Sequence, residues 1–444
     1  HNESNPKQSS IQYWSLGSHR AADQSEVIDD EKTAIKELES LLTQSIKSQM
    51  LSDVPLGAFL SGGIDSSLIV ALMQKESIKP IKTFTIGFED VDYDESSYAQ
   101  AVASHLKTDH HSLIVSETET QSVIPLLGNM YDEPFADSSQ IPTYLVCKAA
   151  KEHVTVALSG DAGDELFGGY NRYFWGPKIW NKLSWMPYHV RRLLGKSINS
   201  LPTSSWNVVG NLMGKRFLSN PVSQFGDKAK KLGVRLEQVR SMQDLYFSLV
   251  REWDDPTLIL EDYSSNNQSQ ENLQSILRSH FSEKDPELSM MFCDTMTYLP
   301  DDILCKVDRA AMATSLETRV PFLDHRIAEF SLKIPLNMKI RDGQGKWILR
   351  QILNDNVPKE LIDRPKTGFG IPVGKWLRGP LKDWADDLLN PLRISAEGYF
   401  KTDLIARIWK EHVDGSHDWT AKLWTILMFQ AWLDEQKTFG DLNA

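Results

Sequence analysis

Cysteine is scarce in this chain, whose 444 residues include only Cys147, Cys293 and Cys305. Thiols so few and so widely spaced exclude a disulfide framework and a zinc knuckle. They favour a reducing, cytoplasmic compartment in which the thiols are buried and structural. Long hydrophobic runs are also missing, because no apolar stretch approaches the ~20 residues that a membrane span requires. No signal peptide is visible, and we expect no membrane partner.

Basic blocks are absent as well. The net charge is −12 at pH 7, and this balance argues against nonspecific binding to nucleic acid. We therefore expect no nucleic-acid partner. The sequence does have apolar material, since 41% of its residues are hydrophobic, which is enough for a substantial core. A chain of this length accommodates one large or two medium domains.

Strand-like and helical patterns alternate over residues 31–175. The strand-like runs lie at 56–60, 81–88, 110–115 and 154–159, and the helical runs lie at 32–50, 66–75, 95–106, 117–130 and 139–151. This alternation predicts an α/β fold, with a parallel twisted sheet flanked by helices on both faces. Ligands of such sheets bind at the carboxyl ends of the strands.

The rest of the chain has a different character. Residues 1–30 are polar and irregular, which predicts a linker or tail. After residue 175 the strand pattern fades, and we expect residues 176–444 to be mostly helical, with a surface loop at 252–272. Residues 31–175 would then form an ATP-binding core, and the helical part would complete the active site.

A glycine loop joins the strand at 56–60 to the following helix. It reads Leu60-Ser61-Gly62-Gly63-Ile64-Asp65-Ser66-Ser67-Leu68. Such a turn points backbone N–H groups and a helix N-terminus at an anion, and its serines add hydroxyl donors. A carboxylate inside an anion site indicates an accompanying cation, so Asp65 suggests Mg²⁺ carried by a polyphosphate. The loop is not a Walker A motif, and the only Gly-Lys-Ser, at 195–197, has Val190 in place of the first glycine.

A second glycine loop follows the strand at 154–159. Residues 159–170 read SGDAGDELFGGY, and they place Asp161, Asp164 and Glu165 close together. Adjacent carboxylates repel each other unless they are solvated or bind a metal. We expect Asp65 and Asp164 to face each other across the top of the sheet and to share Mg²⁺ on a triphosphate.

Four motifs carry a resemblance to a known family. The SGG-x-DS segment at 61–66 resembles the pyrophosphate loop of the N-type ATP pyrophosphatases, and residues 159–170 are similar to a segment of the glutamine-dependent asparagine synthetases. Residues 306–324 (KVDRA…LETRVPFLD) and 364–370 (RPKTGFG) resemble two further stretches of the same family. The motifs stand in the family's order over residues 56–376. The chain therefore resembles the synthetase domain, residues 31–444 here, with an adenine nucleotide alpha-hydrolase-like fold.

The resemblance implies a role for many residues of these motifs. The residues that would hold the leaving pyrophosphate are Ser61, Gly62, Gly63, Ser66 and Ser67. Those that would flank adenine or reach the nucleotide are Phe59, Leu60, Ile86, Ser159 and Gly160. Asp161 stands where most characterised members carry Glu, at a position tied to the acyl-adenylate. Lys366 would neutralise charge on the α-phosphate and pyrophosphate as the bond breaks.

A second group of charged residues has two interpretations. Asp308, Arg309, Glu317 and Arg319 either bind the substrate's carboxylate and amine or form an ion network. An Arg fork suits a substrate carboxylate, but it equally suits Glu317. The neighbouring His110 and His111 have no third ligand nearby in the sequence, and we expect a structural role for them.

The resemblance implies an AMP-forming carbon–nitrogen ligase that uses ATP and Mg²⁺. Its reaction would be amidation of a carboxylate through an acyl-adenylate, with aspartate giving asparagine as the first choice. Open alternatives are the same chemistry on a sugar uronate, a peptide or a β-amino acid, an RNA-modifying pyrophosphatase, and a non-catalytic scaffold. Residues 11–16 look like the family's junction after an N-terminal glutaminase domain, which we expect to be missing here. Ammonia would come from such a domain or a partner, and a homodimer is left open.

Overall fold

The computed structural model describes residues 11–18, 27–90, 94–203, 205, 206, 208, 210, 225–253, 255–262, 277–363 and 370–442. Its strands are β1 (Leu56–Phe59), β2 (Lys82–Phe88), β3 (Asp109–Val115), β4 (Val156–Leu158) and β5 (Glu317–Arg319). They form a five-stranded sheet of order β3-β2-β1-β4-β5, in which every neighbouring pair is parallel. The predicted parallel α/β sheet is confirmed.

Helices make up most of the remaining described chain. The α-helices are α2 (Glu31–Gln49), α3 (Ile64–Glu76), α4 (Ser96–Leu106), α5 (Glu117–Gln121), α6 (Leu127–Met130), α7 (Gln140–Lys151), α8 (Gly163–Phe167), α9 (Asn171–Leu183), α10 (Tyr188–Ser200), α12 (Phe225–Gln238), α13 (Met242–Val250), α15 (Pro286–Met296), α16 (Cys305–Met312), α17 (His325–Lys333), α18 (Leu336–Lys339), α19 (Trp347–Asn354), α20 (Val373–Leu377), α21 (Lys382–Leu388), α22 (Pro391–Glu397), α23 (Thr402–Val413) and α24 (Thr420–Leu442). Short 3₁₀ turns are η2 (Ile124–Leu126), η3 (Pro256–Leu258), η5 (Pro321–Leu323) and η6 (Lys359–Leu361), and η4 (Leu299–Leu304) is a π-helix.

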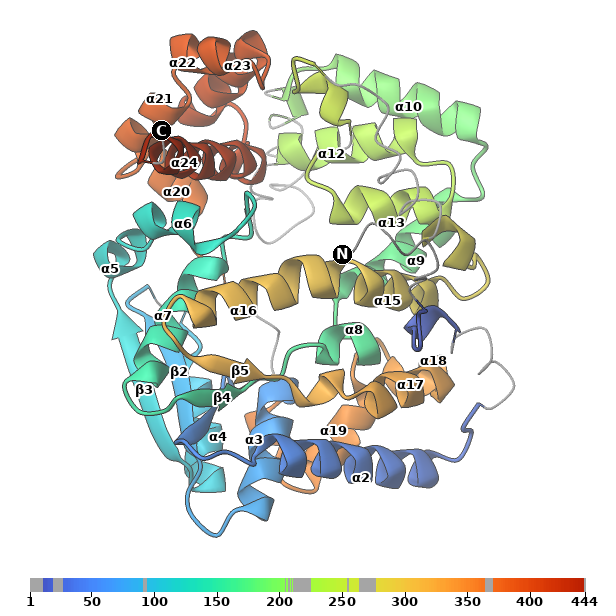
Figure 1. Ribbon diagram of the computed structural model, residues 1–444. Coiled ribbons are helices and arrows are strands. Elements are labelled where there is room, and N and C mark those ends of the chain that lie inside the picture. Colours follow the sequence, from blue (N-terminus) through green and yellow to red (C-terminus); the bar gives the residue numbers. More distant parts are fainter. Residues whose placement is uncertain are drawn as a thin grey trace, which may run out of the picture.

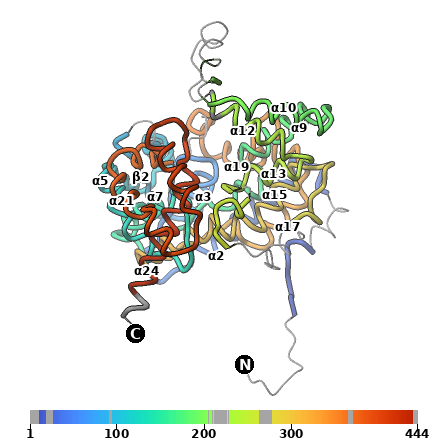
Figure 2. Tube along the Cα trace, turned by 90° about the horizontal axis from the view of Figure 1, so that it is seen from above, coloured from blue at the N-terminus to red at the C-terminus, as the bar shows by residue number. Residues whose placement is uncertain are grey.

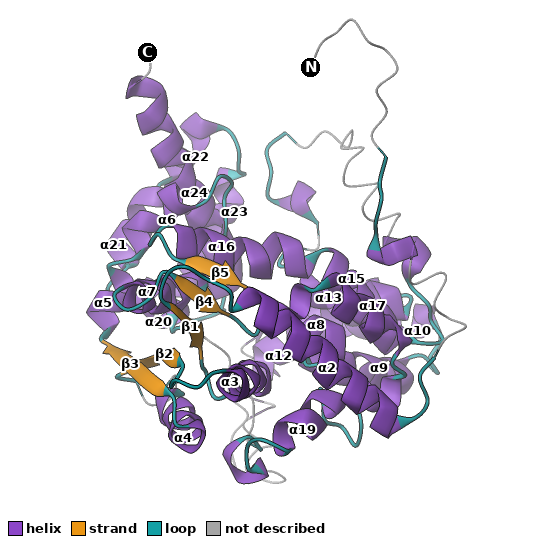
Figure 3. Cartoon of the chain, turned by 60° about the horizontal axis from the view of Figure 1, so that its bottom comes forward, coloured by secondary structure: helices purple, strands orange, loops and turns teal. Residues whose placement is uncertain are grey.

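Both faces of the sheet are covered by helices. Ala58 and Leu158 belong to a core cluster with α2, α3, α4, α17 and α19. Phe84 and Ala157 face the opposite way, into a second cluster with α7, α16 and α20 to α24. Figure 3 shows the strands lying between α3 and α4 on one side and α7 and α16 on the other. Because side chains alternate along a strand, apolar residues at both parities require this double cover.

Two helical groups stand at either side of the sheet's upper end (Figure 1). One consists of α20 to α24, and the other contains α9, α10, α12 and α13. Viewed from above, they lie on opposite sides of the molecule (Figure 2). No helix in the described ranges combines the length and the apolar character needed to cross a membrane.

A buried aspartate ties the second helical group to α15. Asp294 is fully buried and accepts hydrogen bonds from Arg172 Nε at 2.7 Å, Tyr173 OH at 2.6 Å and Tyr246 OH at 2.8 Å. These partners lie on α9 and α13, so one carboxylate joins three helices. A buried charge is tolerated because it is both paired and hydrogen-bonded.

Strand β5 was not predicted, since residues 176–444 were expected to be mostly helical. It has only three residues, Glu317 to Arg319, and no alternation of apolar and polar side chains. It joins the edge of the sheet through hydrogen bonds such as Ser159 N to Arg319 O at 2.8 Å. The strand therefore exists because β4 offers a free edge, which no local pattern reveals.

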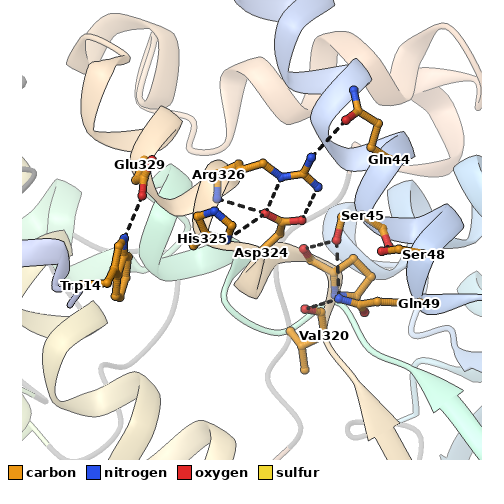
Figure 4. A network of polar contacts seen from close by, with 11 residues as sticks. Trp14, Gln44, Ser45, Ser48, Gln49, Val320, Asp324, His325, Arg326 and Glu329 are labelled. Carbon is orange, nitrogen blue, oxygen red and sulfur yellow. Dashed lines mark hydrogen bonds and ion pairs between the residues drawn. The ribbon is translucent and has the colours of Figure 1, made fainter. Parts of the chain in front are cut away.

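Polar contacts hold α2 against the segment that follows β5 (Figure 4). Ser45 Oγ donates to the carbonyl of Pro321 at 2.9 Å, and Arg326 joins Asp324 at 2.6 Å and Gln44 at 3.1 Å. The predicted N-terminal tail is also partly docked, because the Nε1–H of Trp14 donates to Glu329 at 2.8 Å. Residues 12 to 17 around it include Leu16, which is only 5% exposed.

Candidate active site

The first glycine loop leads from β1 directly into α3. Gly63 is the N-cap of α3 and provides no side-chain cap, so backbone N–H groups at this helix start keep their capacity for an anion. Ser61 Oγ and Ser66 Oγ lie 3.0 Å apart and line the same turn. Gly62 has φ of +72°, and a Cβ there would lie 2.9 Å from the backbone nitrogen of Ala99. The local geometry matches the predicted phosphate-binding turn.

The second loop packs tightly against the first. A Cβ on Gly160 would lie 2.8 Å from the backbone nitrogen of Ser66, and a Cβ on Gly163 would collide with the carboxylate of Asp65. Only glycine permits so close an approach at these two positions. The tips of the neighbouring strands β1 and β4 thus bring the two loops into direct contact.

Asp65 and Asp164 converge on one cation, the ammonium group of Lys346. Lys346 Nζ lies 2.7 Å from Asp164 Oδ1 and forms a second ion pair with Asp65 Oδ2. The lysine is 5% exposed. Although burial opposes it, the two carboxylates raise the pKa of Lys346 well above its usual value. The expected meeting of the two aspartates at the top of the sheet therefore has a physical counterpart in the structure.

Sequence reasoning missed Lys346. It lies at the N-cap of α19 with φ of +59°. A cation is unfavourable at a helix N-terminus, so its position there was the available signal that a specific contact holds it. Its partner Asp65 lies 281 residues earlier in the chain.

The donor set at this point suits Mg²⁺. Two carboxylates from separate loops already reach a single cationic centre, and hard oxygen ligands of this kind are those that Mg²⁺ accepts together with substrate phosphates. Within the described ranges no group of three or more His, Cys, Asp or Glu side chains could hold a metal by itself. Asp65 and Asp164 would accordingly hold the ion together with phosphate oxygens, and not as a closed protein cage.

Other acids of the second loop are shielded from water. Ser159 Oγ donates a hydrogen bond to Asp161 Oδ2, and burial raises the pKa of Asp161. Lys306 and Lys346 act in the opposite direction on that carboxyl group. Glu165 is 1% exposed and accepts from Tyr170 OH at 2.6 Å. Asp161 therefore lies at the boundary between the fields of two buried lysines.

The residues expected near the nucleotide base lie at the ends of β1 and β2. Leu60 is 1% exposed, and its N–H donates to the carbonyl of Phe84 at 2.9 Å. Ile86 is 2% exposed within the second core cluster, and Phe59 packs against the same cluster. Ser67 is fully buried, and its hydroxyl has no hydrogen-bond partner in the described part of the chain.

The remaining expected residues lie elsewhere. Lys366 and its motif at 364–369 fall outside the described residues. Arg309 pairs with Asp132 at 2.6 Å and Asp308 at 2.8 Å, and the side chains of these partners are 79% and 57% exposed. Arg319 pairs with Glu317 at 2.7 Å and also donates to the backbone carbonyls of residues 49 and 51. These contacts favour the ion-network interpretation of Asp308, Arg309, Glu317 and Arg319 over substrate binding.

The two neighbouring histidines lie on β3. His110 Nδ1 is 2.9 Å from the hydroxyl oxygen of Thr83, and burial together with His111 lowers the pKa of His110 to about 4. His111 stacks on His153 with ring centroids 4.1 Å apart. These contacts agree with a structural role.

Comparison with known proteins now adds to this geometry. Residues 37–434 match the asparagine synthase family, and the chain belongs to that family. It is 32% identical over 408 residues to asparagine synthetase [glutamine-hydrolyzing] 1 of Bacillus subtilis, covering 91% of this chain and 60% of the relative. It is 33% identical over 407 residues to a putative asparagine synthetase [glutamine-hydrolyzing] of Mycobacterium bovis, covering 91% and 58%.

More distant relatives show the same relation. Asparagine synthetase [glutamine-hydrolyzing] of Bos taurus is 23% identical over 423 residues, covering 88% of this chain and 55% of the relative. The chain thus spans little more than half the length of the curated relatives that it matches. The family membership predicted from the four motifs is confirmed.

Proposed function

We propose that this chain catalyses ATP-dependent amidation of a carboxylic acid, with AMP and pyrophosphate as products. One observation carries the proposal: Asp65 and Asp164, at the tips of adjacent strands, converge on a single cation beside an uncapped helix N-terminus. Such an arrangement suits a metal triphosphate. The family membership and the names of the relatives support asparagine synthesis from aspartate.

The first chemical step is adenylation. An oxygen of the acid's carboxylate attacks the α-phosphorus of ATP, the bond from that phosphorus to the bridging oxygen breaks, and pyrophosphate leaves with the electron pair. Ser61, Ser66 and the start of α3 would bind the β- and γ-phosphates through hydroxyl and backbone donors. Lys346, and Lys366 by resemblance, would place positive charge where negative charge accumulates.

The second step forms the amide. Ammonia attacks the acyl carbon, the C–O bond to AMP breaks, AMP leaves, and one proton is released. Water must be kept from the acyl-adenylate, because hydrolysis would waste it. The shielded position of Asp161 and Glu165 behind the second loop suits such exclusion. Mg²⁺, held by Asp65 and Asp164, would supply charge neutralisation for the phosphates.

Acid-dependent ATP–pyrophosphate exchange tests this proposal. We expect incorporation of labelled pyrophosphate into ATP when aspartate is present and only background exchange without it. A sugar uronate and a β-amino acid run in parallel decide between aspartate and the rival acids. With ammonia supplied directly, the products should be asparagine, AMP and pyrophosphate. Formation of ADP and orthophosphate would contradict the proposed bond cleavage.

A matched pair of variants locates the activity. S66A removes a hydroxyl from the first loop, and we expect KM for ATP to rise roughly 10-fold, which corresponds to one charge-assisted hydrogen bond. S416A removes an exposed hydroxyl that donates to the carbonyl of Glu411 at 3.1 Å, far along the chain in the α23–α24 connection. We expect S416A to leave exchange unchanged. Equal loss in both variants would count against the loop as the phosphate site.

A further inference from the structure

A second polar cluster lies next to Asp161. Lys306, on α16, is 8% exposed, and its ammonium group donates to Asp137 Oδ2 at 2.7 Å and Ser139 Oγ at 2.8 Å. Asp302, on the π-helix η4, interacts electrostatically with both Asp137 and Lys306. Lys306 also acts on Asp161, so the cluster adjoins the second glycine loop. π-helical turns are frequent at functional sites.

Two buried polar atoms of this cluster have no partner in the described chain. They are the Oδ1 atom of Asp302 and the hydroxyl of Tyr131, a residue that is 5% exposed. The same electrostatic neighbours, Asp137 and Asp302, act on Tyr131. An unsatisfied buried polar atom costs free energy and requires an explanation. Both atoms are available to a ligand.

The charges of the cluster do not balance. Asp137, Asp161 and Asp302 surround one cation, Lys306. Burial and the neighbouring Asp137 raise the pKa of Asp302 to about 7, which shows that a compensating positive charge is missing there. An ammonium group entering beside Asp302 and Asp137 would supply that charge.

Lys306 keeps a donor for an anion. An ammonium group has three N–H donors, and two of them are used by Asp137 and Ser139. Its third donor can bind a carboxylate oxygen, and the hydroxyl of Tyr131 can bind a second one. By contrast Arg309, one turn further along α16, already pairs with Asp132 and Asp308 at the surface.

We infer that this cluster is the pocket for the acid, and that it takes an amino-dicarboxylic acid. Its ammonium group lies against Asp302 and Asp137, and one carboxylate lies against Lys306. The second carboxylate then extends past Asp161 toward the nucleotide. This assignment rests on the proposed amidation, and it disfavours a sugar uronate because a uronate carries no ammonium group.

Analogues that lack one group each make the inference testable. Succinate keeps both carboxylates of aspartate but lacks the ammonium group, and 3-aminopropanoate keeps the ammonium group but lacks the α-carboxylate. We expect the wild-type chain to support ATP–pyrophosphate exchange with aspartate at least 100-fold more efficiently, as kcat/KM, than with either analogue. Comparable exchange with succinate or 3-aminopropanoate would overturn the inference.

Variants assign each group to its partner. Lys306→Met should reduce the aspartate to 3-aminopropanoate preference about 10- to 100-fold and leave the aspartate to succinate preference intact. Asp302→Asn should do the reverse. KM for ATP should stay the same in both. The control is Lys339→Met, which removes another buried lysine, 4% exposed, and should change neither preference.

The outcomes separate the two proposals. If no acid supports exchange in the wild-type chain, the proposed function fails. If aspartate supports exchange but K306M and D302N lower all three acids equally, or if R309Q changes a preference instead, the pocket is wrongly assigned while the function stands. Should K306M not fold, the wild-type preferences and D302N still decide.

Discussion

Replacing Lys346 by methionine should destabilise the protein in a way that Mg²⁺ reverses. The substitution keeps the apolar length of the side chain and removes the cation between Asp65 and Asp164. Two carboxylates then remain close together in a shielded site. Mg²⁺ is expected to compensate because those carboxylates are its proposed ligands.

The size of the effect follows from burial. Removing one partner of a buried ion pair costs about 3–5 kcal/mol. The side chains of Asp65 and Asp164 retain 16% and 21% exposure, so screening reduces the expected loss to about 2–3 kcal/mol. For a chain of 444 residues the unfolding entropy makes 1 kcal/mol correspond to about 1 °C in Tm. Mg²⁺ at ten times its Kd should restore about 1.4 kcal/mol.

Calorimetry without nucleotide, with and without Mg²⁺, measures both quantities. The K346M variant should melt about 2–3 °C below the wild type, and Mg²⁺ should recover about half of that difference. K382M is the control, because it breaks the exposed pair with Asp386 and should lose less than about 1 kcal/mol with no response to Mg²⁺. Unchanged stability in K346M, or a Mg²⁺ response equal to the wild type's, would refute the convergence of the two aspartates on one cation.

Three further changes probe the surrounding structure. Gly163→Ala should cost about 1–3 kcal/mol and weaken ATP binding, because its Cβ would meet the carboxylate of Asp65, as measured by melting and by titration with ATP. Asp294→Asn should cost about 2–4 kcal/mol, since the buried guanidinium of Arg172 loses its counterion, as measured by thermal unfolding. His110→Gln should reduce the loss of stability on acidification, as followed by melting between pH 4 and 7.

The sign of the acid effect follows from the two states of His110. Its folded pKa, lowered to about 4, lies below the unfolded value near 6.5, so the unfolded chain binds the extra proton first. Stability is therefore lost as the pH falls from about 6.5 to 4, by on the order of 2 kcal/mol. A variant that loses stability as steeply as the wild type would contradict this origin.

Controls separate these effects from general disruption. Gly379→Ala should cost little, because the nearest atom to its Cβ is a backbone oxygen at 3.4 Å. Tyr246→Phe removes one of three hydrogen bonds to Asp294 and should cost about 1 kcal/mol. If Y246F were as damaging as D294N, the ion pair with Arg172 would not be the main contribution.

Much of the α/β core could be predicted from sequence. The first four strands and the helices between them agree with the structure to within a few residues, because apolar periodicity reports the local backbone directly. Both glycine loops were found for the same reason, since SGG-x-DS and SGDAGDELFGGY combine turn residues with donors and acids in one short segment.

Residues of one kind could still be assigned to the wrong role. The charged residues at 308, 309, 317 and 319 lie in a motif of the family, yet their side chains pair with one another and with Asp132. Lys306 begins the same motif and is buried. The sequence contains both lysine and arginines in one stretch, but it does not show which of them faces inward.

The sequence alone determined the order of strands and helices, the two phosphate-type turns and the family, because each of these is written within a window of about 20 residues. Tertiary structure decided which charges meet. Lys346 reaches Asp65 across 281 residues, Lys306 reaches Asp137 across 169, and β5 exists only as a neighbour of β4. Such partners are fixed by which surfaces pack together, and the energy of a buried ion pair depends on that packing and not on any local pattern.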